Sequence, residues 1–265
     1  GVYASGTEAF SERERASFET LGEIAGFAIT AVRNRNLLLC DTITEITFEL
    51  GESSVLTRLS QSLDSTLKLE GLVPQADDSL LCFVSVEGDG IDRLDQETAG
   101  MKEIRRTRVI NESDSGGRVE LTTCGSTPLL AISSLGGTVR RASFDGGTGR
   151  LVVDLPRDGD VRRIVDTVCR EHDAEFVSKA ERKRSVTTAR ESRDELDDRL
   201  TKRQRTALQT AYLADYFESP RGSTAEEVAT SLDITGSTLL HHLRAGQRKL
   251  LDAYLSGRKQ ASKRE

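Results

Sequence analysis

The chain has 265 residues, enough for about two domains that each bury a hydrophobic core. It carries 37 Lys and Arg against 43 Asp and Glu, a net charge of −6, and it has no run of 18 apolar residues that could span a membrane. The four cysteines are widely spaced and form no Cys-x-x-Cys pair, which argues against a zinc site and against a disulfide framework.

Residues 1–36 are predicted to form a strand and then an amphipathic helix from about Ser11 to Asn34. Ser11 and Glu14 have the spacing of a capping box, and apolar residues recur every three or four positions after them. One strand and one helix cannot make a domain. Since the chain also begins with Gly and has no leader sequence, we expect it to be a piece of a longer cytoplasmic protein.

Residues 37–178 contain a pattern that we interpret as an internal repeat. The first copy is predicted as strand 41–50, helix 53–63, strands 67–73 and 80–87, helix 91–100 and strand 104–110. The second copy is predicted as strand 119–124, helix 127–135, strands 138–144 and 151–155, helix 160–172 and strand 174–178. Residues 145–149, DGGTG, have the composition of a hairpin turn between the two central strands of the second copy.

Both copies follow the order strand, helix, strand, strand, helix, strand, which is the ferredoxin-like order. We therefore predict an α+β fold: a tandem ferredoxin-like body followed by an all-α helix-turn-helix domain. Each copy is expected to form its own four-stranded antiparallel sheet with two helices on one face. Residues 179–199 are almost wholly polar and are predicted to be a solvated linker.

Residues 200–256 carry the signals of three helices. Thr201 with Gln204 and Thr224 with Glu227 have capping-box spacing, and each pair is predicted to begin a helix. The first helix has an apolar stripe that includes Tyr212, and the segment 219–222, SPRG, ends it. The second helix spans only two turns, so it needs packing partners to be stable.

Residues 233–236 form a turn of the length that joins the two helices of a helix-turn-helix motif, with Ile234 as the apolar plug beneath it. On the third helix, one stripe is expected to face the core and consists of Leu239, Leu243, Gly246 and Leu250. A second stripe, about 200° away, is polar and basic, as a helix in a major groove requires, and consists of Ser237, His241, Arg244 and Arg248.

The charge of the chain is divided between its parts. Residues 199–265 hold 12 Lys and Arg against 7 Asp and Glu, a net charge of +5, whereas residues 1–198 have a net charge of −11. A cationic module on an anionic body favours a phosphate-backbone partner for that module, to which the basic tail 257–265 would add nonspecific contacts. The alternative is an ordinary three-helix bundle with a solvated basic face.

The C-terminal residues also resemble a known family. The motifs LTKRQ, AYLADYFESPR and STLLHHLRAGQRKLLDA are similar to the C-terminal helix-turn-helix of the bacterio-opsin activator family of haloarchaeal transcription regulators. Residues 1–36 resemble the final strand and closing helix of a GAF sensory domain, and the body matches the position of that family's intermediate domain. The resemblance implies a cytoplasmic, sensor-linked regulator that binds double-stranded DNA.

We expect a homodimer that binds two half-sites, with the transcription machinery as a further partner and an effector that the sequence does not specify. The predicted DNA-contacting residues are Thr224, Ser237, Thr238, His241, Arg244, Arg248 and Lys249. The alternative function is a small-molecule sensor or protein-interaction module whose C-terminal helices dock on a protein, and Leu240 on the third helix favours it.

We predict no enzyme, cofactor or metal site. The three histidines, His172, His241 and His242, stand in no catalytic arrangement, and His242 is interpreted as a structural residue beside the buried stripe. The glycine-rich segments 88–90 and 145–149 lack the pattern of a phosphate-binding loop.

Overall fold

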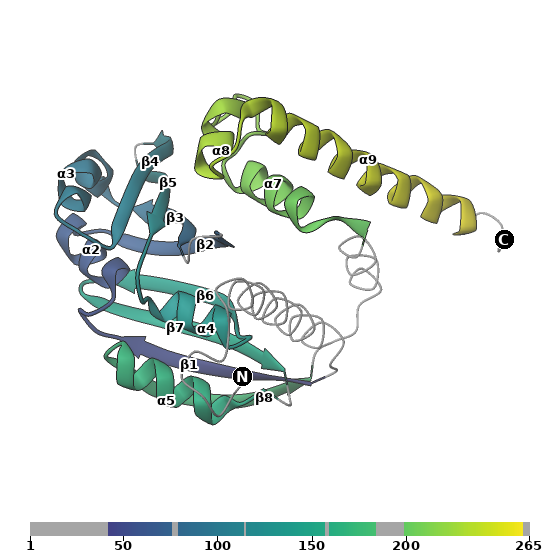
Figure 1. The fold of residues 1–265 in the computed structure, drawn as a ribbon. Coiled ribbons are helices and arrows are strands. Elements are labelled where there is room, and N and C mark those ends of the chain that lie inside the picture. The colour runs from purple at the N-terminus through teal and green to yellow at the C-terminus, as the bar shows by residue number, and fades with distance from the viewer. Residues whose placement is uncertain (1–41, 76–78, 114, 157–158, 184–198, 262–265) are drawn as a thin grey trace, which may run out of the picture.

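The computed structural model describes residues 42–261, apart from 76–78, 114, 157–158 and 184–198 (Figure 1). The predicted strand and helix in residues 1–36 and most of the predicted linker lie outside these described residues. Side chains are described as far as residue 252. None of the described helices is long and apolar enough to cross a membrane.

The body is built on one eight-stranded sheet in which every pair of neighbours is antiparallel. The strands are β1 (Thr42–Leu50), β2 (Thr66–Pro74), β3 (Leu80–Glu87), β4 (Ile104–Ser113), β5 (Gly116–Thr123), β6 (Thr138–Asp145), β7 (Thr148–Pro156) and β8 (Ala174–Lys183). The helices between them are α2 (Val55–Leu63), the 3-10 helix η1 (Asp89–Arg93), α3 (Leu94–Ala99), α4 (Pro128–Ser134) and α5 (Val161–Glu171). The predicted sequence of elements is confirmed, although the predicted helix 91–100 begins as a 3-10 turn.

The predicted pairing of the strands is wrong. In two separate ferredoxin-like units, β1 would lie between β3 and β4, and β5 would lie between β7 and β8. The observed order is β4-β5-β3-β2-β6-β7-β1-β8, so β1 and β5 have exchanged places. The two halves join where Leu67 and Lys68 of β2 pair with Phe144 and Ser143 of β6. One continuous sheet therefore replaces the two sheets that we expected.

The connection between β4 and β5 gives the physical reason. β4 ends at Ser113 and β5 begins at Gly116, so only two residues join them. A two-residue connection forces two strands to pair as an antiparallel hairpin. β5 therefore occupies the position beside β4, and β1 pairs instead with β7 and β8.

The hairpin between β6 and β7 is as predicted. Asp145 pairs with Thr148 across the turn, and Gly146 and Gly147 both have positive φ, at 53° and 84°. A two-residue turn of this kind matches the right-handed twist of the flanking strands and favours glycine at both positions.

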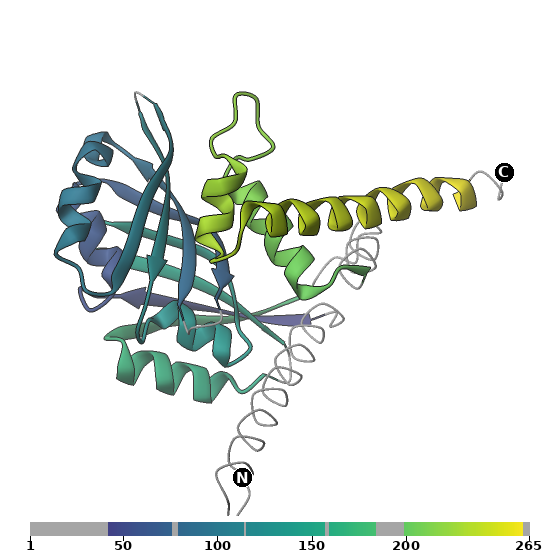
Figure 2. The same ribbon diagram turned by 45° about the horizontal axis from the view of Figure 1, so that its top comes forward.

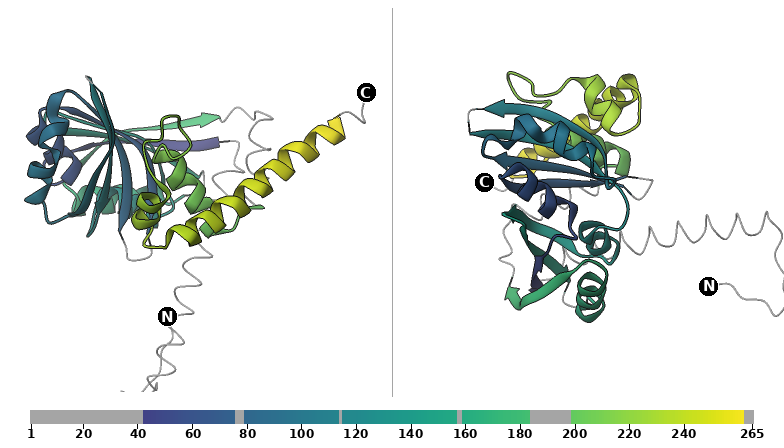
Figure 3. Two further views of the ribbon diagram at one scale, coloured as in Figure 1. Left: turned by 90° about the horizontal axis from the view of Figure 1, so that it is seen from above. Right: turned by 90° about the vertical axis from the view of Figure 1, so that its left-hand side faces the viewer.

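Helices α2, α3, α4 and α5 all pack on one face of the sheet and share its main core. The C-terminal helices cover part of the opposite face, as the view from above makes clear (Figure 3). Strand β3 is buried on both sides, because Leu80, Cys82 and Val84 face the helix layer while Leu81 and Phe83 face the C-terminal helices. This explains its nearly continuous apolar sequence, LLCFVSV.

The C-terminal part consists of α7 (Lys202–Leu213), α8 (Ala225–Ser231) and α9 (Gly236–Ala261), and α9 packs on both of the others (Figure 2). Two expected boundaries differ. β8 continues to Lys183, into the predicted linker, and α9 continues to Ala261, into the predicted tail. One core residue was also wrongly predicted, since Tyr212 is 69% exposed while Ala207, Ala211 and Ala214 are buried.

Candidate nucleic-acid interface

Both predicted capping boxes are present at the starts of α7 and α8. The Thr201 hydroxyl accepts from the Gln204 amide at 3.3 Å, and the Gln204 side chain accepts from the Thr201 amide at 3.1 Å. The Thr224 hydroxyl accepts from the Glu227 amide at 3.3 Å, while Glu227 Oε2 accepts from the Thr224 amide at 2.6 Å. These bonds satisfy backbone donors that each helix start would otherwise leave free.

The carboxylate of Glu227 has a pKa below its ordinary value. The main causes are the hydrogen bonds that it accepts from the amide and the hydroxyl of Thr224. The positive charges of Arg108 and Arg106, which lie on β4 of the body, lower this pKa further. The first turn of α8 therefore lies next to a basic part of the sheet.

The turn between α8 and α9 has the predicted form. Asp233 adopts a left-handed backbone conformation with φ of 53°, and the Ile234 amide donates to the Ala229 carbonyl at 3.0 Å. Ile234 packs against the core of the three helices, as expected of the plug. Thr235, which sequence reasoning did not single out, has hydroxyl contacts to the hydroxyls of Ser237 at 3.0 Å and Thr238 at 2.8 Å.

Helix α9 has a buried face and an exposed face. Leu239, Leu243 and Gly246 are buried, and Leu250 is half-buried. The four residues of the predicted polar stripe are all exposed: Ser237, His241, Arg244 and Arg248. The helix therefore presents polar and basic side chains at helical spacing on the side away from its packing partners.

The remaining predicted contact residues are less uniformly placed. Thr224 is exposed at the start of α8, and Thr238 is half-buried. Lys249 is turned toward α7, where its ammonium group donates to Gln204 Oε1 at 2.9 Å. Arg248 lies 3.7 Å from the carboxylate of Asp252, one turn further along.

The two histidines of α9 differ in their environment. His241 is exposed, and its ring meets that of His242 edge to face with centroids 5.7 Å apart. His242 is half-buried, and burial lowers its pKa, as do the nearby His241 and Arg203. The structural role expected of His242 agrees with this partial burial but stays a prediction.

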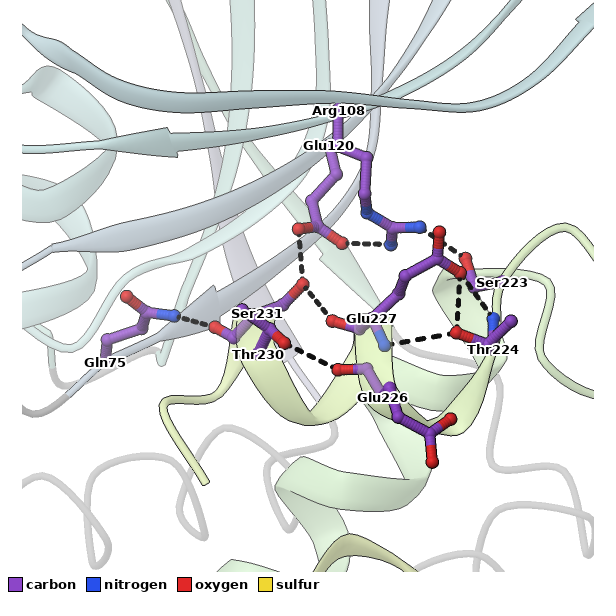
Figure 4. A network of polar contacts seen from close by, with 9 residues as sticks. All are labelled: Gln75, Arg108, Glu120, Ser223, Thr224, Glu226, Glu227, Thr230 and Ser231. Carbon is purple, nitrogen blue, oxygen red and sulfur yellow. Dashed lines mark hydrogen bonds and ion pairs between the residues drawn. The ribbon is translucent and has the colours of Figure 1, made fainter. Parts of the chain in front are cut away.

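The contact between the body and α8 is a polar network that sequence reasoning missed (Figure 4). Arg108 of β4 donates to the Ser223 hydroxyl at 2.7 Å and pairs with Glu120 of β5 at 2.6 Å. Glu120, only 1% exposed, also accepts a hydrogen bond from the Ser231 hydroxyl at the end of α8. Gln75 donates to the Ser231 carbonyl at 2.6 Å.

A second set of contacts joins the body to the end of α7. Asp215 accepts from Asn111 at 2.6 Å and pairs with Arg118, which also pairs with Glu70 at 2.6 Å. These groups line an open cleft of about 480 Å³ beside Tyr212. No periodicity marks these residues in the sequence, because Asp215 lies 104 positions from Asn111 and 97 positions from Arg118.

Apolar packing completes the docking of the three helices. Leu213 lies directly over Gly71 of β2, where a Cβ atom would come within 2.4 Å of Leu213 Cδ1. Val73, Leu81, Phe83 and Ile110 of the sheet share a core with the helices. The helices and the exposed stripe of α9 are therefore fixed relative to the sheet.

A short second helix, a tight turn and a longer third helix with an exposed polar face define the helix-turn-helix class of DNA-binding proteins. Comparison with known families agrees. Residues 200–252 match the HTH_10 family, described as an HTH DNA binding domain, and residues 41–194 match BAT, described as the GAF and HTH_10 associated domain. The chain belongs to this BAT and HTH_10 family, as the sequence resemblance predicted.

Three relatives illustrate the similarity. A Haloferax volcanii protein provisionally named as a transcriptional regulator is 38% identical over 96% of this chain and 44% of its own length. The bacterioopsin transcriptional activator of Halobacterium salinarum is 30% identical over 96% of this chain and 38% of its own length. The transcriptional regulator NarO of Haloferax volcanii is 55% identical over 22% of this chain and 28% of its own length. The chain thus spans less than half of the first two relatives.

Proposed function

We propose that this chain is the DNA-binding part of a sensor-linked transcription regulator and that α9 reads base edges in the major groove. One observation carries the proposal: the polar stripe of α9 is exposed on the side opposite the buried Leu239 and Leu243. A recognition helix needs this division between a packed face and a face of donors and acceptors. The names of the relatives support the same class of function.

The residues are assigned different roles by their position on the helices. Ser237, Thr238, His241 and Arg244 occupy the first turns of α9 and are assigned to base edges. Arg248, Lys249 and Thr224 are assigned to phosphates. Lys249 must leave Gln204 to reach a phosphate, so we expect its contribution to be the smallest of the three.

A single unit of this size reads only a few base pairs, so we propose a cytoplasmic homodimer that binds two half-sites and acts on the transcription machinery. We infer that the body derives from two ferredoxin-like units, because exchanging β1 and β5 restores that strand order in both halves. The alternative, docking of the C-terminal helices on a protein, is supported by Leu251, which is 58% exposed on α9. Leu240, which favoured it in the sequence, is half-buried.

The test is selection of binding sites from genomic DNA fragments by the 265-residue chain at low and high salt. Wild-type protein is expected to enrich one motif. Arg244→Ala is expected to lose about 1–3 kcal/mol of binding at one base position and to relax selectivity there. Arg162→Ala, an exposed arginine on α5 in the opposite layer, is the control and is expected to bind as wild type.

Binding that ignores sequence in wild-type protein and disappears at modest salt contradicts the proposal. In that case, docking on a protein through the apolar residues of α9 becomes the better explanation of the exposed helix.

A further inference from the structure

The body contains a short basic segment that its overall charge does not lead one to expect. Residues 1–198 have a net charge of −11, yet the seven residues 102–108, KEIRRTR, hold four cationic side chains and one carboxylate. That carboxylate, Glu103, pairs with Arg58 of α2. The segment therefore presents net positive charge on an otherwise acidic body.

The fold places this segment at an accessible edge. Its last five residues, 104–108, begin β4, which is the first strand in the order of the sheet and, among the described strands, pairs only with β5. Lys102 and Arg105 are exposed and Arg106 is half-buried. Arg106 forms no ion pair among the residues that the structure describes, so its charge is available to a partner.

The same edge lies beside the helix-turn-helix unit. Arg108 of β4 bonds to Ser223, the residue before Thr224, which is the N-cap of α8 (Figure 4). Arg106, two positions earlier on the strand, acts electrostatically on Glu227 in the first turn of α8. In helix-turn-helix complexes the helix before the recognition helix crosses the DNA backbone. The phosphates next to α8 would then lie next to β4.

We propose that β4 supplies a second contact to the DNA backbone, in which Arg106 binds a phosphate beside α8 and the exposed Lys102, just before the strand, extends the positive surface along the flanking DNA. This inference rests on the proposed DNA binding by α9 and adds to it a part of the body. The contact is independent of sequence, because phosphates are the same at every base pair. The body thereby contributes affinity, while α9 contributes selectivity.

The test measures DNA affinity of the 265-residue chain as a function of salt for wild type, Arg106→Ala and Arg106→Lys. Each phosphate contact contributes about 0.9 to the slope of log K against log salt concentration. Loss of one contact should reduce the slope by about 0.9 and weaken binding about fourfold at 0.2 M salt, equally for operator and random DNA. Arg106→Lys keeps the charge and should keep the slope, and Arg162→Ala should leave both slope and affinity unchanged.

A second comparison separates this role from neutralisation of Glu227. Glu227→Gln removes the negative charge but retains an acceptor for the capping box. If Arg106 binds phosphate, Arg106→Ala weakens binding equally in the wild-type and Glu227→Gln backgrounds. If the effect disappears in the Glu227→Gln background, Arg106 only offsets that carboxylate and the proposal is overturned.

The remaining outcomes are distinct. An unchanged salt slope in Arg106→Ala overturns the β4 contact while leaving DNA binding by α9 intact. A loss of selectivity instead of a uniform loss of affinity also overturns it, because Arg106 would then act by positioning α9. Absence of DNA binding by the wild-type chain refutes the function proposed for α9 itself.

Discussion

The contact between Gly71 and Leu213 predicts how tightly the three C-terminal helices are held on the sheet. A Cβ atom at Gly71 would lie 2.4, 2.8 and 3.1 Å from Cδ1, Cδ2 and Cγ of Leu213. Because these three atoms at the branched end of the Leu213 side chain are too close to the added Cβ atom, Leu213 must move away from the sheet in Gly71→Ala. We expect a loss of about 1–3 kcal/mol in the free energy of unfolding, the usual cost of overpacking.

The second half of this double-mutant cycle replaces Leu213, the side chain that lies over Gly71. Leu213→Ala removes the half-buried branched end of the side chain and should lower the free energy of unfolding by about 1–2 kcal/mol, below the range for a fully buried leucine. Without that group, the methyl group added at Gly71 meets open space, and it also reduces the conformational freedom of the unfolded chain. Gly71→Ala is then expected to be neutral or stabilising by up to about 1 kcal/mol in the Leu213→Ala background.

The assay is urea unfolding of the four proteins, with hydrogen exchange at Leu81 and Phe83 as the local reporter of the covered face of β3. Gly100→Ala is the control, because nothing lies within 4 Å of a Cβ atom there. The reasoning is refuted if Gly71→Ala is as stable as wild type. It is also refuted if the substitution costs the same in both backgrounds, since the two residues would then not be coupled.

Two further predictions concern titratable groups. The pKa of Glu227 is lowered in the folded protein, so its contribution to stability is present above its unfolded pKa and is lost as the pH falls through the folded pKa. The stability advantage of wild type over Glu227→Gln, measured by urea unfolding, should therefore shrink as the pH is lowered across the acidic range. Equal pH profiles for the two proteins would contradict this. Burial raises the pKa of the Cys82 thiol to about 12, so Cys82 should resist alkylation at pH 8 in the native protein and react only once the protein is unfolded. The half-buried Cys124 should react before Cys82, as read by mass spectrometry. Labelling of Cys82 at the rate of Cys124 in native protein would show that the sheet opens there.

The sequence alone determined the local structure and the class of the C-terminal helices. Strand alternation, apolar stripes and capping boxes depend on residues within a few positions of one another, and they predicted the elements of the body in their observed order. The same local signals placed Ser237, His241, Arg244 and Arg248 on one exposed stripe of α9. Their role toward DNA remains a prediction.

Only the tertiary structure decided which strands are neighbours and where the helices dock. β1 and β5 both have an apolar face that suits the helix layer, so the alternation of apolar and polar residues cannot distinguish their positions. The two-residue connection from Ser113 to Gly116 is the local feature that places β5 beside β4 and so exchanges β5 with β1. Arg108, Glu120 and Ser231 are polar residues that a sequence reader assigns to the surface. They are brought together only because folding places β4 and β5 beside α8, where Glu120 pairs with Arg108 and accepts a hydrogen bond from Ser231.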